Sequence, residues 1–479
     1  MMREKRFYIN TIGCQMNVHD SERISALMQR CGYRQIPFPE GADLIFLNTC
    51  AIREKAEQKV FSFLGRLAAL KKRNPDLIIA ACGCVAQQEA DRIFERTAHV
   101  DLVLGTHSYG RLPKIIEEIH RNRRRIVDVD VGESIEEIRT FFSQKTADKA
   151  PGVSRFVTIM QGCDNFCAYC VVPFVRGRER SRDPEEIISE IQDLVAAGVR
   201  EVTLLGQNVN SYGKKEGISS FSELLARINT IEGLERIRFT TSHPKDLSDD
   251  LVAAFGRLDK LCRHIHLPVQ SGSDRVLSRM HRRYTRAHYI DRVKALRLVC
   301  PDISITTDFI VGFPGESEDD FQETLSMMAV VEFDSLFAFK YSDRKGTRAA
   351  GLMEKVPESI KTERVKTLFK FQRDVTLKKY RALVGTFQEV LVDGLSKKTQ
   401  KQTDSSGPEG IQWTGRTLGN KIVNFRVKGG SPFQDVVYPG ALVRVHIKQA
   451  FANSLVGEAP ECRPGRFEEI RRKHSCCIK

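Results

Sequence analysis

The sequence predicts an α/β protein in three parts: a Rossmann-like parallel-sheet domain, a partial (β/α)6 barrel and a small C-terminal β-barrel. Three patterns support this prediction. Strand-like and helix-like segments alternate over residues 5–121, and they alternate again over residues 149–379. Residues 382–450 instead contain short β-like runs separated by Gly, Pro, Asn and Asp turns, which is typical of a closed barrel of about five strands.

The composition is that of an ordinary globular chain of 479 residues, 41% hydrophobic and 28% charged. No apolar run reaches the ~18 residues that a membrane span needs, and we expect no signal peptide, so we expect a cytoplasmic protein without a membrane contact. The net charge of +14 favours a polyanionic partner, although a solvated basic surface has the same composition. We expect a monomer, because no coiled-coil seam is visible.

The N-terminal unit, residues 5–121, is expected to alternate four strands with four helices. Strands are predicted at 6–11, 43–47, 76–80 and 101–104, and helices at 21–30, at 53–72, from 87 onward and at 112–120. Because a helix follows each strand, the strands are expected to be parallel, with their carboxyl ends at one shared edge of the sheet.

Three of the thirteen cysteines, Cys14, Cys50 and Cys84, each lie just beyond the carboxyl end of one of these strands. A lone cysteine is usually a small core residue. Three cysteines at equivalent positions on one sheet edge instead favour convergence on an iron–sulfur cluster. Cys82 lies in the strand that precedes Cys84, and we interpret it as a packing residue.

The central unit, residues 149–379, is predicted to contain six strands with helices between them. The strands are expected at 156–160, 201–205, 237–240, 264–267, 303–309 and 336–340. This repetition indicates a partial (β/α) barrel, in which the site lies at the carboxyl ends of the strands. Polar or glycine-rich loops follow the second to fifth strands and lie on that rim.

A loop with the spacing C-x-x-x-C-x-x-C follows the first strand of this barrel and contains Cys163, Cys167 and Cys170. Three thiolates on one short loop can bind three irons of a [4Fe–4S] cube, which leaves one iron open. An open iron can chelate the amine and the carboxylate of S-adenosylmethionine (SAM). Zinc is the simpler interpretation of such cysteines, but zinc sites usually close with four protein ligands, and each trio lacks an evident fourth.

The C-terminal barrel, residues 382–450, is predicted from β-like runs at 387–392, 422–425 and 443–447. Its pattern is similar to that of oligonucleotide-binding barrels, and Phe425 is expected in its core. Residues 451–479 are interpreted as a disordered polar tail. Its cysteines remain unassigned: Cys462, Cys476 and Cys477.

The cysteine loop, with an aromatic residue just before its last cysteine, resembles the radical SAM superfamily. Four further segments narrow the resemblance to its methylthiotransferases: Gly13-Cys14-Gln15-Met16-Asn17, Asn48-Thr49-Cys50, Gly83-Cys84-Val85-Ala86-Gln87 and Tyr341-Ser342-Asp343-Arg344-Lys345-Gly346-Thr347. The resemblance covers nearly the whole chain and is greatest for the branch that modifies isopentenyl-type adenosine in tRNA. The segment Gly415-Arg416-Thr417 is similar to a motif in the RNA-binding TRAM domain of that branch.

The resemblance implies two [4Fe–4S] clusters. An auxiliary cluster would be held by Cys14, Cys50 and Cys84, and a radical SAM cluster by Cys163, Cys167 and Cys170. It also implies SAM, consumed twice in each turnover and bound by residues of the rim loops: Tyr169, Gln207, Asn208, Ser242, His243, Gln270, Gly312 and Pro314. No catalytic residue is assigned beyond the clusters.

The family converts C2–H of adenosine 37 into C2–S–CH3, so the resemblance implies the tRNA anticodon stem-loop as substrate. The TRAM domain would contact RNA through Arg416 and Lys421. An electron donor such as flavodoxin or ferredoxin would reduce the radical SAM cluster. One SAM would yield a radical that removes hydrogen, the auxiliary cluster would deliver sulfur, and the second SAM would supply the methyl group.

Three alternatives stay open at this point. Two of them keep the chemistry and change the substrate, to threonylcarbamoyladenosine in tRNA or to an aspartate of a ribosomal protein. The third belongs to another class, an RNA-binding iron–sulfur sensor without turnover. The complete set of rim loops argues against the sensor, and the N-terminal and TRAM segments favour the isopentenyl-adenosine branch.

Overall fold

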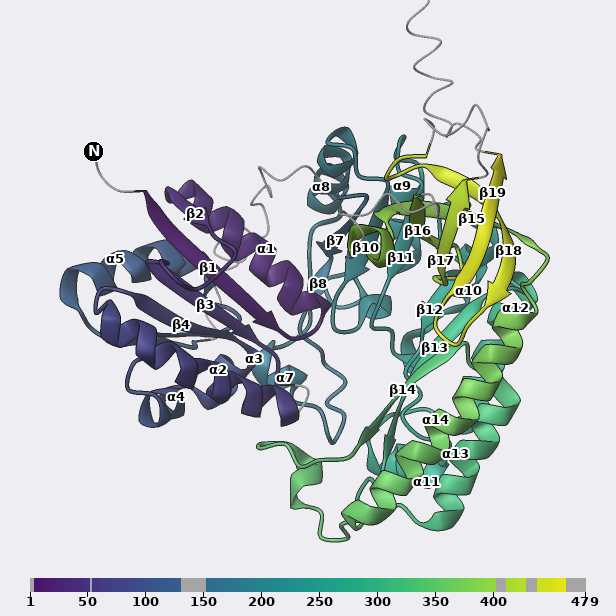
Figure 1. The fold of residues 1–479 in the computed structure, drawn as a ribbon. Coiled ribbons are helices and arrows are strands. Elements are labelled where there is room, and N and C mark those ends of the chain that lie inside the picture. The colour runs from purple at the N-terminus through teal and green to yellow at the C-terminus, as the bar shows by residue number, and fades with distance from the viewer. Residues whose placement is uncertain (1–3, 52–53, 131–151, 402–410, 428–436, 462–479) are drawn as a thin grey trace, which may run out of the picture.

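The computed structural model describes residues 4–51, 54–130, 152–401, 411–427 and 437–461. These residues form three units in chain order: a parallel sheet, a core of parallel strands and a closed barrel (Figure 1). The predicted three-part α/β architecture is therefore confirmed. The predicted tail beyond residue 461, with its three cysteines, and most of the connector between the first two units lie outside the described residues.

The N-terminal unit is a six-stranded sheet with the order β2-β1-β3-β4-β5-β6, and all of its neighbouring strands are parallel. The strands are β1 (Lys5–Ile12), β2 (Tyr33–Gln35), β3 (Leu44–Thr49), β4 (Ile78–Gly83), β5 (Leu102–Leu104) and β6 (Ile126–Asp128). This order is the flavodoxin-like form of the doubly wound sheet. The edge strands β2 and β6 were not predicted, and β6 extends the unit past the predicted limit of residue 121.

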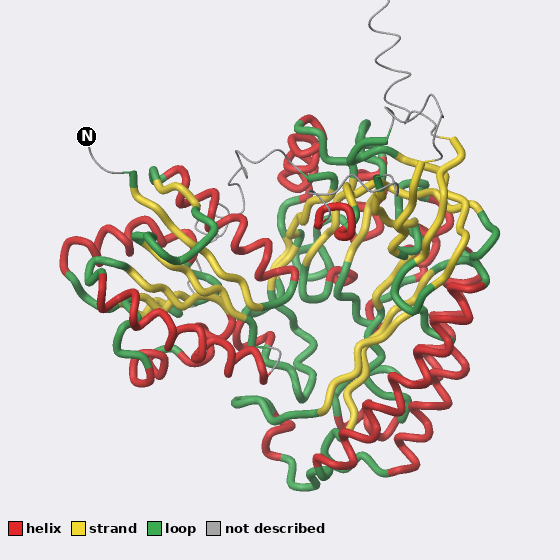
Figure 2. The backbone as a smooth tube through the Cα atoms, in the orientation of Figure 1, coloured by secondary structure: helices red, strands yellow, loops and turns green. Residues whose placement is uncertain are grey.

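Helices cover both faces of this sheet (Figure 2). Helices α1 (Gln15–Arg30) and α5 (Leu112–Asn122) pack on one face, and α2 (Glu54–Arg73), α3 (Cys84–Glu89) and α4 (Asp91–Arg96) pack on the other. Successive strand residues point to opposite faces, so Phe46 joins the first apolar cluster and Ile45 the second. Two helices begin earlier than predicted, α1 directly after Cys14 and α3 at Cys84 itself.

The core has the six predicted strands, arranged as two three-stranded parallel sheets, β11-β10-β7 and β12-β13-β14. They are β7 (Ser154–Thr158), β10 (Glu201–Leu205), β11 (Arg236–Phe239), β12 (His264–His266), β13 (Ser304–Val311) and β14 (Ser335–Lys340). Ile237 of β11 forms a bridge with Leu261, which lies shortly before β12 in the chain. This arrangement is the predicted partial barrel.

The core helices fill the spaces between these strands and bury the largest apolar cluster of the described chain. They are α8 (Pro184–Ala196), α9 (Phe221–Asn229), α10 (Asp249–Arg257), α11 (Asp274–Arg279), α12 (Arg286–Val299), α13 (Glu318–Val331) and α14 (Glu358–Arg381). Ser220 and Ser317 start α9 and α13 with capping boxes. None of the described helices is both long and apolar enough to cross a membrane.

The C-terminal unit is a closed barrel with the strand order β15-β16-β17-β19-β18, and Phe425 lies fully buried in it as predicted. Its strands are β15 (Phe387–Leu395), β16 (Gln412–Thr417), β17 (Ile422–Val427), β18 (Leu442–Ala450) and β19 (Leu455–Glu461). The predicted limit at residue 450 is wrong, because β19 pairs with both β17 and β18 and closes the barrel. The tail therefore begins after residue 461.

The closed barrel docks on the amino ends of the core strands, away from the carboxyl ends that form the rim. Arg236 donates to the carbonyl oxygen of Arg416 at 2.5 Å, and Arg238 donates to that of Thr417 at 2.9 Å. Lys421 forms an ion pair with Asp334 at 3.0 Å, in which both side chains are about nine-tenths buried (12% and 11% exposed). Burial favours a raised pKa for Asp334, but Lys421 and Lys379 hold that pKa below its usual value.

Replacing Lys421 by Met is expected to loosen the barrel from the core. Asp334 would keep Lys379 but lose a buried partner, and we expect the free energy of unfolding to fall by about 1–3 kcal/mol. Chemical denaturation of the variant measures this loss. Lys366→Met is the matched control, because Lys366 is 67% exposed and its ion pair contributes less than ~1 kcal/mol. Equal stability of the two variants would contradict a docking role for Lys421.

Candidate active site

The sheet register brings the three N-terminal cysteines to one edge. Ile12 lies opposite Thr49 across β1 and β3, and Thr49 lies opposite Gly83 across β3 and β4. The chain reaches a cysteine one or two residues after each of these positions. Because neighbouring strands are about 4.8 Å apart, Cys14, Cys50 and Cys84 leave the sheet side by side. They flank β1 and β3, the point where the strand order reverses and where such sheets bind ligands.

Two of the cysteines in this trio are buried, Cys14 is partly buried, and their thiols act on one another. Cys50 and Cys84 are each 4% exposed. A hydrogen bond with Cys50 is the main reason that the pKa of Cys14 falls to about 6, against the opposing effect of burial. Burial raises the pKa of Cys84, and the nearby guanidinium of Arg176 opposes that rise. The lowered pKa of Cys14 and the cation near Cys84 favour binding of metal by thiolates.

Two buried asparagines, which the sequence analysis did not single out, hold this edge together. The amide nitrogen of Asn17 donates to Oδ1 of Asn48 at 3.1 Å, and that of Asn48 donates to the carbonyl oxygen of Asn17 at 2.9 Å. Oδ1 of Asn17 also accepts from the backbone N–H of Cys14 at 3.3 Å. Both asparagines stand in the segments that carried the family resemblance, so their presence there was the available signal.

The second trio lies on a loop that leaves the first core strand through β8 (Met160–Gln161). Gly162 has φ +80°, and a Cβ there would collide with the carbonyl oxygen of Arg178. Its N–H donates to Oε1 of Gln207 at 2.5 Å. Gln207, predicted to bind SAM, therefore braces the loop directly ahead of Cys163.

The cysteines of this loop are packed against cationic and aromatic side chains. Burial raises the pKa of Cys163 to about 11 and that of Cys170 to about 12. The guanidinium of Arg282, which is 4% exposed, donates to Sγ of Cys167 at 3.4 Å and to the carbonyl oxygen of Pro268 at 2.7 Å. Arg282 was not predicted, because its contact with Cys167 spans 115 residues and has no local sequence pattern.

Three of the predicted SAM residues present buried polar atoms that have no hydrogen-bond partner in the described chain. These atoms are Oδ1 of Asn208, Oγ of Ser242 and Nε2 of His243. Nδ1 of His243 accepts from the N–H of Lys245, and burial lowers the pKa of His243 well below its usual value, so the neutral ring carries its proton on Nε2. Oδ1 of Asn208 can therefore accept a hydrogen bond from a polar ligand, and the hydroxyl of Ser242 can donate or accept one. The Nε2–H group of His243 can donate one.

These unpartnered atoms are connected to the cysteine loop by direct contacts. Nζ of Lys245 donates to Oδ1 of Asn165 at 2.6 Å, and Nδ2 of Asn165 approaches Sγ of Cys163 at 3.6 Å. The ring of His243 meets that of Tyr284 at 5.5 Å, and Tyr284 accepts from Arg282. The donor set on this rim therefore fits SAM bound beside an iron–sulfur cluster.

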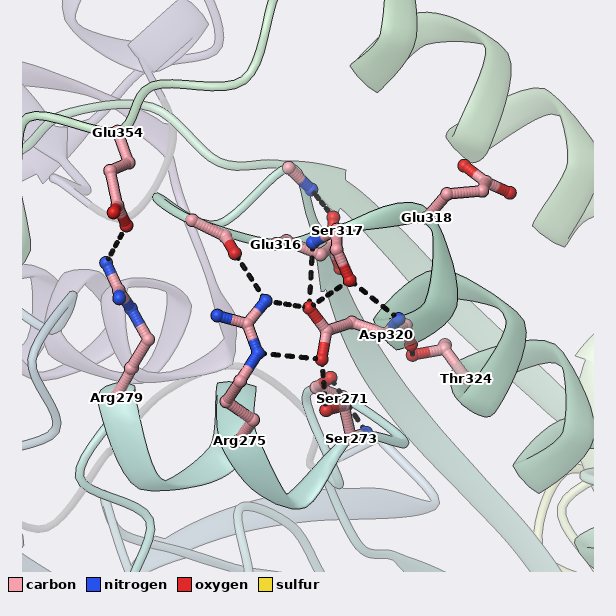
Figure 3. A network of polar contacts seen from close by, with 12 residues as sticks. Ser271, Ser273, Arg275, Arg279, Glu316, Ser317, Glu318, Asp320, Thr324 and Glu354 are labelled. Atoms are coloured by element: carbon pink, nitrogen blue, oxygen red, sulfur yellow. Dashed lines mark hydrogen bonds and ion pairs between the residues drawn. The ribbon is translucent and has the colours of Figure 1, made fainter.

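A polar network fixes together two loops that carry further predicted SAM residues (Figure 3). Asp320 accepts from the hydroxyl of Ser273 at 2.6 Å and from the backbone N–H of Ser317 at 2.7 Å, and it pairs with Arg275. This network joins the loop that carries Gln270 to the loop that carries Gly312 and Pro314.

Gln270, Gly312 and Pro314 are buried, whereas Tyr169 is only partly buried. Gln270 and Gly312 have φ of +73° and +69°, and Pro314 is buried. Tyr169 is half-buried and packs in one apolar cluster with Phe313, next to Gly312. The cysteine loop and the fifth-strand loop are thereby in contact.

The two residues predicted to contact RNA lie far from this rim, at the barrel–core interface. Lys421 is engaged by Asp334 and by the hydroxyl of Ser304 at 2.6 Å, so its assignment to RNA is corrected. The β-like pattern of its segment could not reveal that this turn docks on the core. Arg416 is 41% exposed and donates to Asn420, and its RNA contact stays a prediction.

Comparison with known proteins first gives the class. Residues 157–328 match the radical SAM superfamily, and residues 6–105 match the family described as Uncharacterized protein family UPF0004. Among solved structures, a radical S-adenosylmethionine methyltransferase, TsrM, from Kitasatospora setae shares the fold with a TM-score of 0.53 and 12% identity, over 73% of this chain and 74% of that one. The fold and the site thus define a radical SAM enzyme, a class that uses a [4Fe–4S] cluster and SAM.

Curated relatives then give the family. The tRNA-2-methylthio-N(6)-dimethylallyladenosine synthase of Desulfosudis oleivorans is 52% identical over 95% of this chain and 97% of its own length. The protein of the same name from Syntrophus aciditrophicus is 51% identical over 95% of this chain and 94% of its own. The chain belongs to the family of tRNA-2-methylthio-N(6)-dimethylallyladenosine synthases.

Gly162→Ala is expected to displace the cysteine loop. A methyl group there meets backbone on a residue whose φ favours glycine, so we expect the free energy of unfolding to fall by about 1–3 kcal/mol and iron binding by this trio to be lost. Denaturation and iron analysis measure both effects. Gly65→Ala is the control: it lies in α2 with open space around it, and the substitution is expected to leave iron unchanged and to stabilise by up to ~1 kcal/mol.

Proposed function

We propose that this protein catalyses the methylthiolation of C2 of N6-(dimethylallyl)adenosine at position 37 of tRNA. The observation that carries the proposal is the coexistence of two cysteine trios: one on the rim of a radical SAM core, the other at the ligand-binding edge of a flavodoxin-like sheet. The near full-length identity to synthases of this name favours dimethylallyladenosine over threonylcarbamoyladenosine or a ribosomal aspartate.

The residues present suit two iron–sulfur clusters and SAM. We propose that Cys163, Cys167 and Cys170 hold the radical SAM cluster, and that Cys14, Cys50 and Cys84 hold an auxiliary cluster. Bound there, the first cluster and SAM would supply the reductive radical chemistry by which hydrogen can be removed from an unactivated C–H bond, and the auxiliary cluster would supply the sulfur. A flavodoxin or ferredoxin in the cytoplasm would provide the electron, and we expect the enzyme to act as a monomer.

The protein's own contribution is to hold and shield these groups. Gln207 fixes the backbone at Gly162, and Arg282 donates to Cys167, so the loop keeps one conformation. The buried atoms of Asn208, Ser242 and His243 would bind polar groups of SAM. Because His243 is neutral, it acts there as a hydrogen-bond donor rather than as an acid. Burial of these residues keeps water from the reacting atoms.

Iron content tests the two-cluster proposal. Anaerobically reconstituted protein is expected to bind about eight irons per chain, and replacing either trio by Ala is expected to leave about four. Cys82→Ala is the matched control, since Cys82 is fully buried two residues from Cys84 and is expected to leave the iron content unchanged. Retention of all the iron after Cys14, Cys50 and Cys84 are replaced would contradict the auxiliary cluster.

Nucleoside mass spectrometry tests the reaction. Hypomodified tRNA that carries dimethylallyladenosine is incubated without oxygen with the reconstituted protein, SAM and a reductant. We expect that nucleoside to gain the mass of one methylthio group less the mass of the hydrogen atom that it replaces. Release of 5′-deoxyadenosine without this gain would support the radical chemistry but contradict the proposed substrate. If neither product forms although the clusters can be reduced, the result would favour an iron–sulfur sensor without turnover.

A further inference from the structure

A short segment connects the two cysteine trios. Helix α7 (Val172–Val175) begins two residues after Cys170, yet it packs in the N-terminal unit. Val171 and Val175 are 4% and 3% exposed and belong to the same apolar cluster as Cys84. The carbonyl oxygen of Val175 accepts from the hydroxyl of Thr106 at 2.5 Å. One end of the segment is therefore a cysteine of the core, and the other end is fixed beside the N-terminal trio.

Arg176 ends this segment and places a cation against the N-terminal trio. Its side chain is 4% exposed, and its guanidinium pairs at 2.6 Å with Asp20, a residue of α1 that is 4% exposed as well. Arg176 also lies within hydrogen-bonding reach of the Cys84 thiol, and its charge acts on Cys14. Asp20 thus orients a guanidinium from the core towards two cysteines of the other unit.

Charge explains why such a cation would be needed. Three thiolates on a [4Fe–4S] cube leave a net negative charge, which increases on reduction, and burying a negative charge without a partner is costly. Hydrogen bonds to ligating sulfurs and nearby cations stabilise the reduced form and raise the reduction potential of such clusters. The fivefold donor set of arginine allows one side chain to serve both Asp20 and Cys84.

We propose that Arg176 is a positioning residue through which the core controls the auxiliary cluster, by holding the Cys84 thiolate and stabilising the reduced cluster. This inference rests on the proposed auxiliary cluster. Segment 170–176 also connects the two trios, because it runs from Cys170 to residues that pack in the same cluster as Cys84. Arg176 acts on the reaction through Cys84 and is not itself a catalytic residue.

The experiment is an EPR-monitored redox titration of the full-length chain in which Cys163, Cys167 and Cys170 are replaced by Ala, so that only the N-terminal trio binds iron. In this background, Arg176→Met is expected to lower the midpoint potential, and Arg176→Lys to restore part of the shift. Asp20→Asn keeps the guanidinium and is expected to cause a smaller shift. Arg178→Met, at an exposed arginine two residues away, is the control and is expected to cause none.

The outcomes distinguish failure of the proposed auxiliary cluster from failure of the proposed role of Arg176. If the background protein binds no iron, the auxiliary cluster itself is contradicted. If it binds iron and Arg176→Met leaves the potential unchanged, or Asp20→Asn shifts it as far, Arg176 serves only the interface and the inference fails. Loss of iron in Arg176→Met but not in Asp20→Asn would support the inference, while loss in both would overturn it.

Discussion

The in-register pairing of β1, β3 and β4 is the constraint on which the site depends. Parallel strands in a doubly wound sheet must end at the same edge, so residues 37 or 34 positions apart, such as Ile12, Thr49 and Gly83, lie side by side. Cysteines that follow these positions converge without a continuous loop. The Asn17–Asn48 hydrogen bonds then fix the backbone at the point where α1 begins.

The core uses both ends of its strands, for different purposes. The carboxyl ends hold the cysteine loop and the buried polar atoms that suit SAM, while the amino ends receive the closed barrel through Arg236, Arg238 and Asp334. Loops at the rim can therefore vary with the chemistry, since stability comes from the opposite end and from the buried cluster between. Segment 170–176 connects the core to the N-terminal unit.

Local patterns predicted the six core strands, the central strands of the N-terminal sheet and the burial of Phe425, because periodicity and spacing are local properties. They did not predict Arg176 or Arg282, whose roles arise from contacts 156 and 115 residues away. Lys421 was misassigned for the same reason: a basic residue in a turn looks exposed until the docking partner Asp334 is known. Strand β19 was missed because its charged and proline residues weaken a β pattern that pairing on both sides sustains.

The core trio is proposed to serve the removal of hydrogen, and the N-terminal trio the supply of sulfur. Isotope transfer tests this separation of roles most directly. Protein in which Cys14, Cys50 and Cys84 are replaced by Ala is reconstituted and given SAM, a reductant and tRNA deuterated at C2 of the dimethylallyladenosine. We predict deuterium in the released 5′-deoxyadenosine and no methylthio product, because the core trio alone suffices for the removal of hydrogen. Methylthiolated tRNA from this variant, or 5′-deoxyadenosine without deuterium, would contradict it.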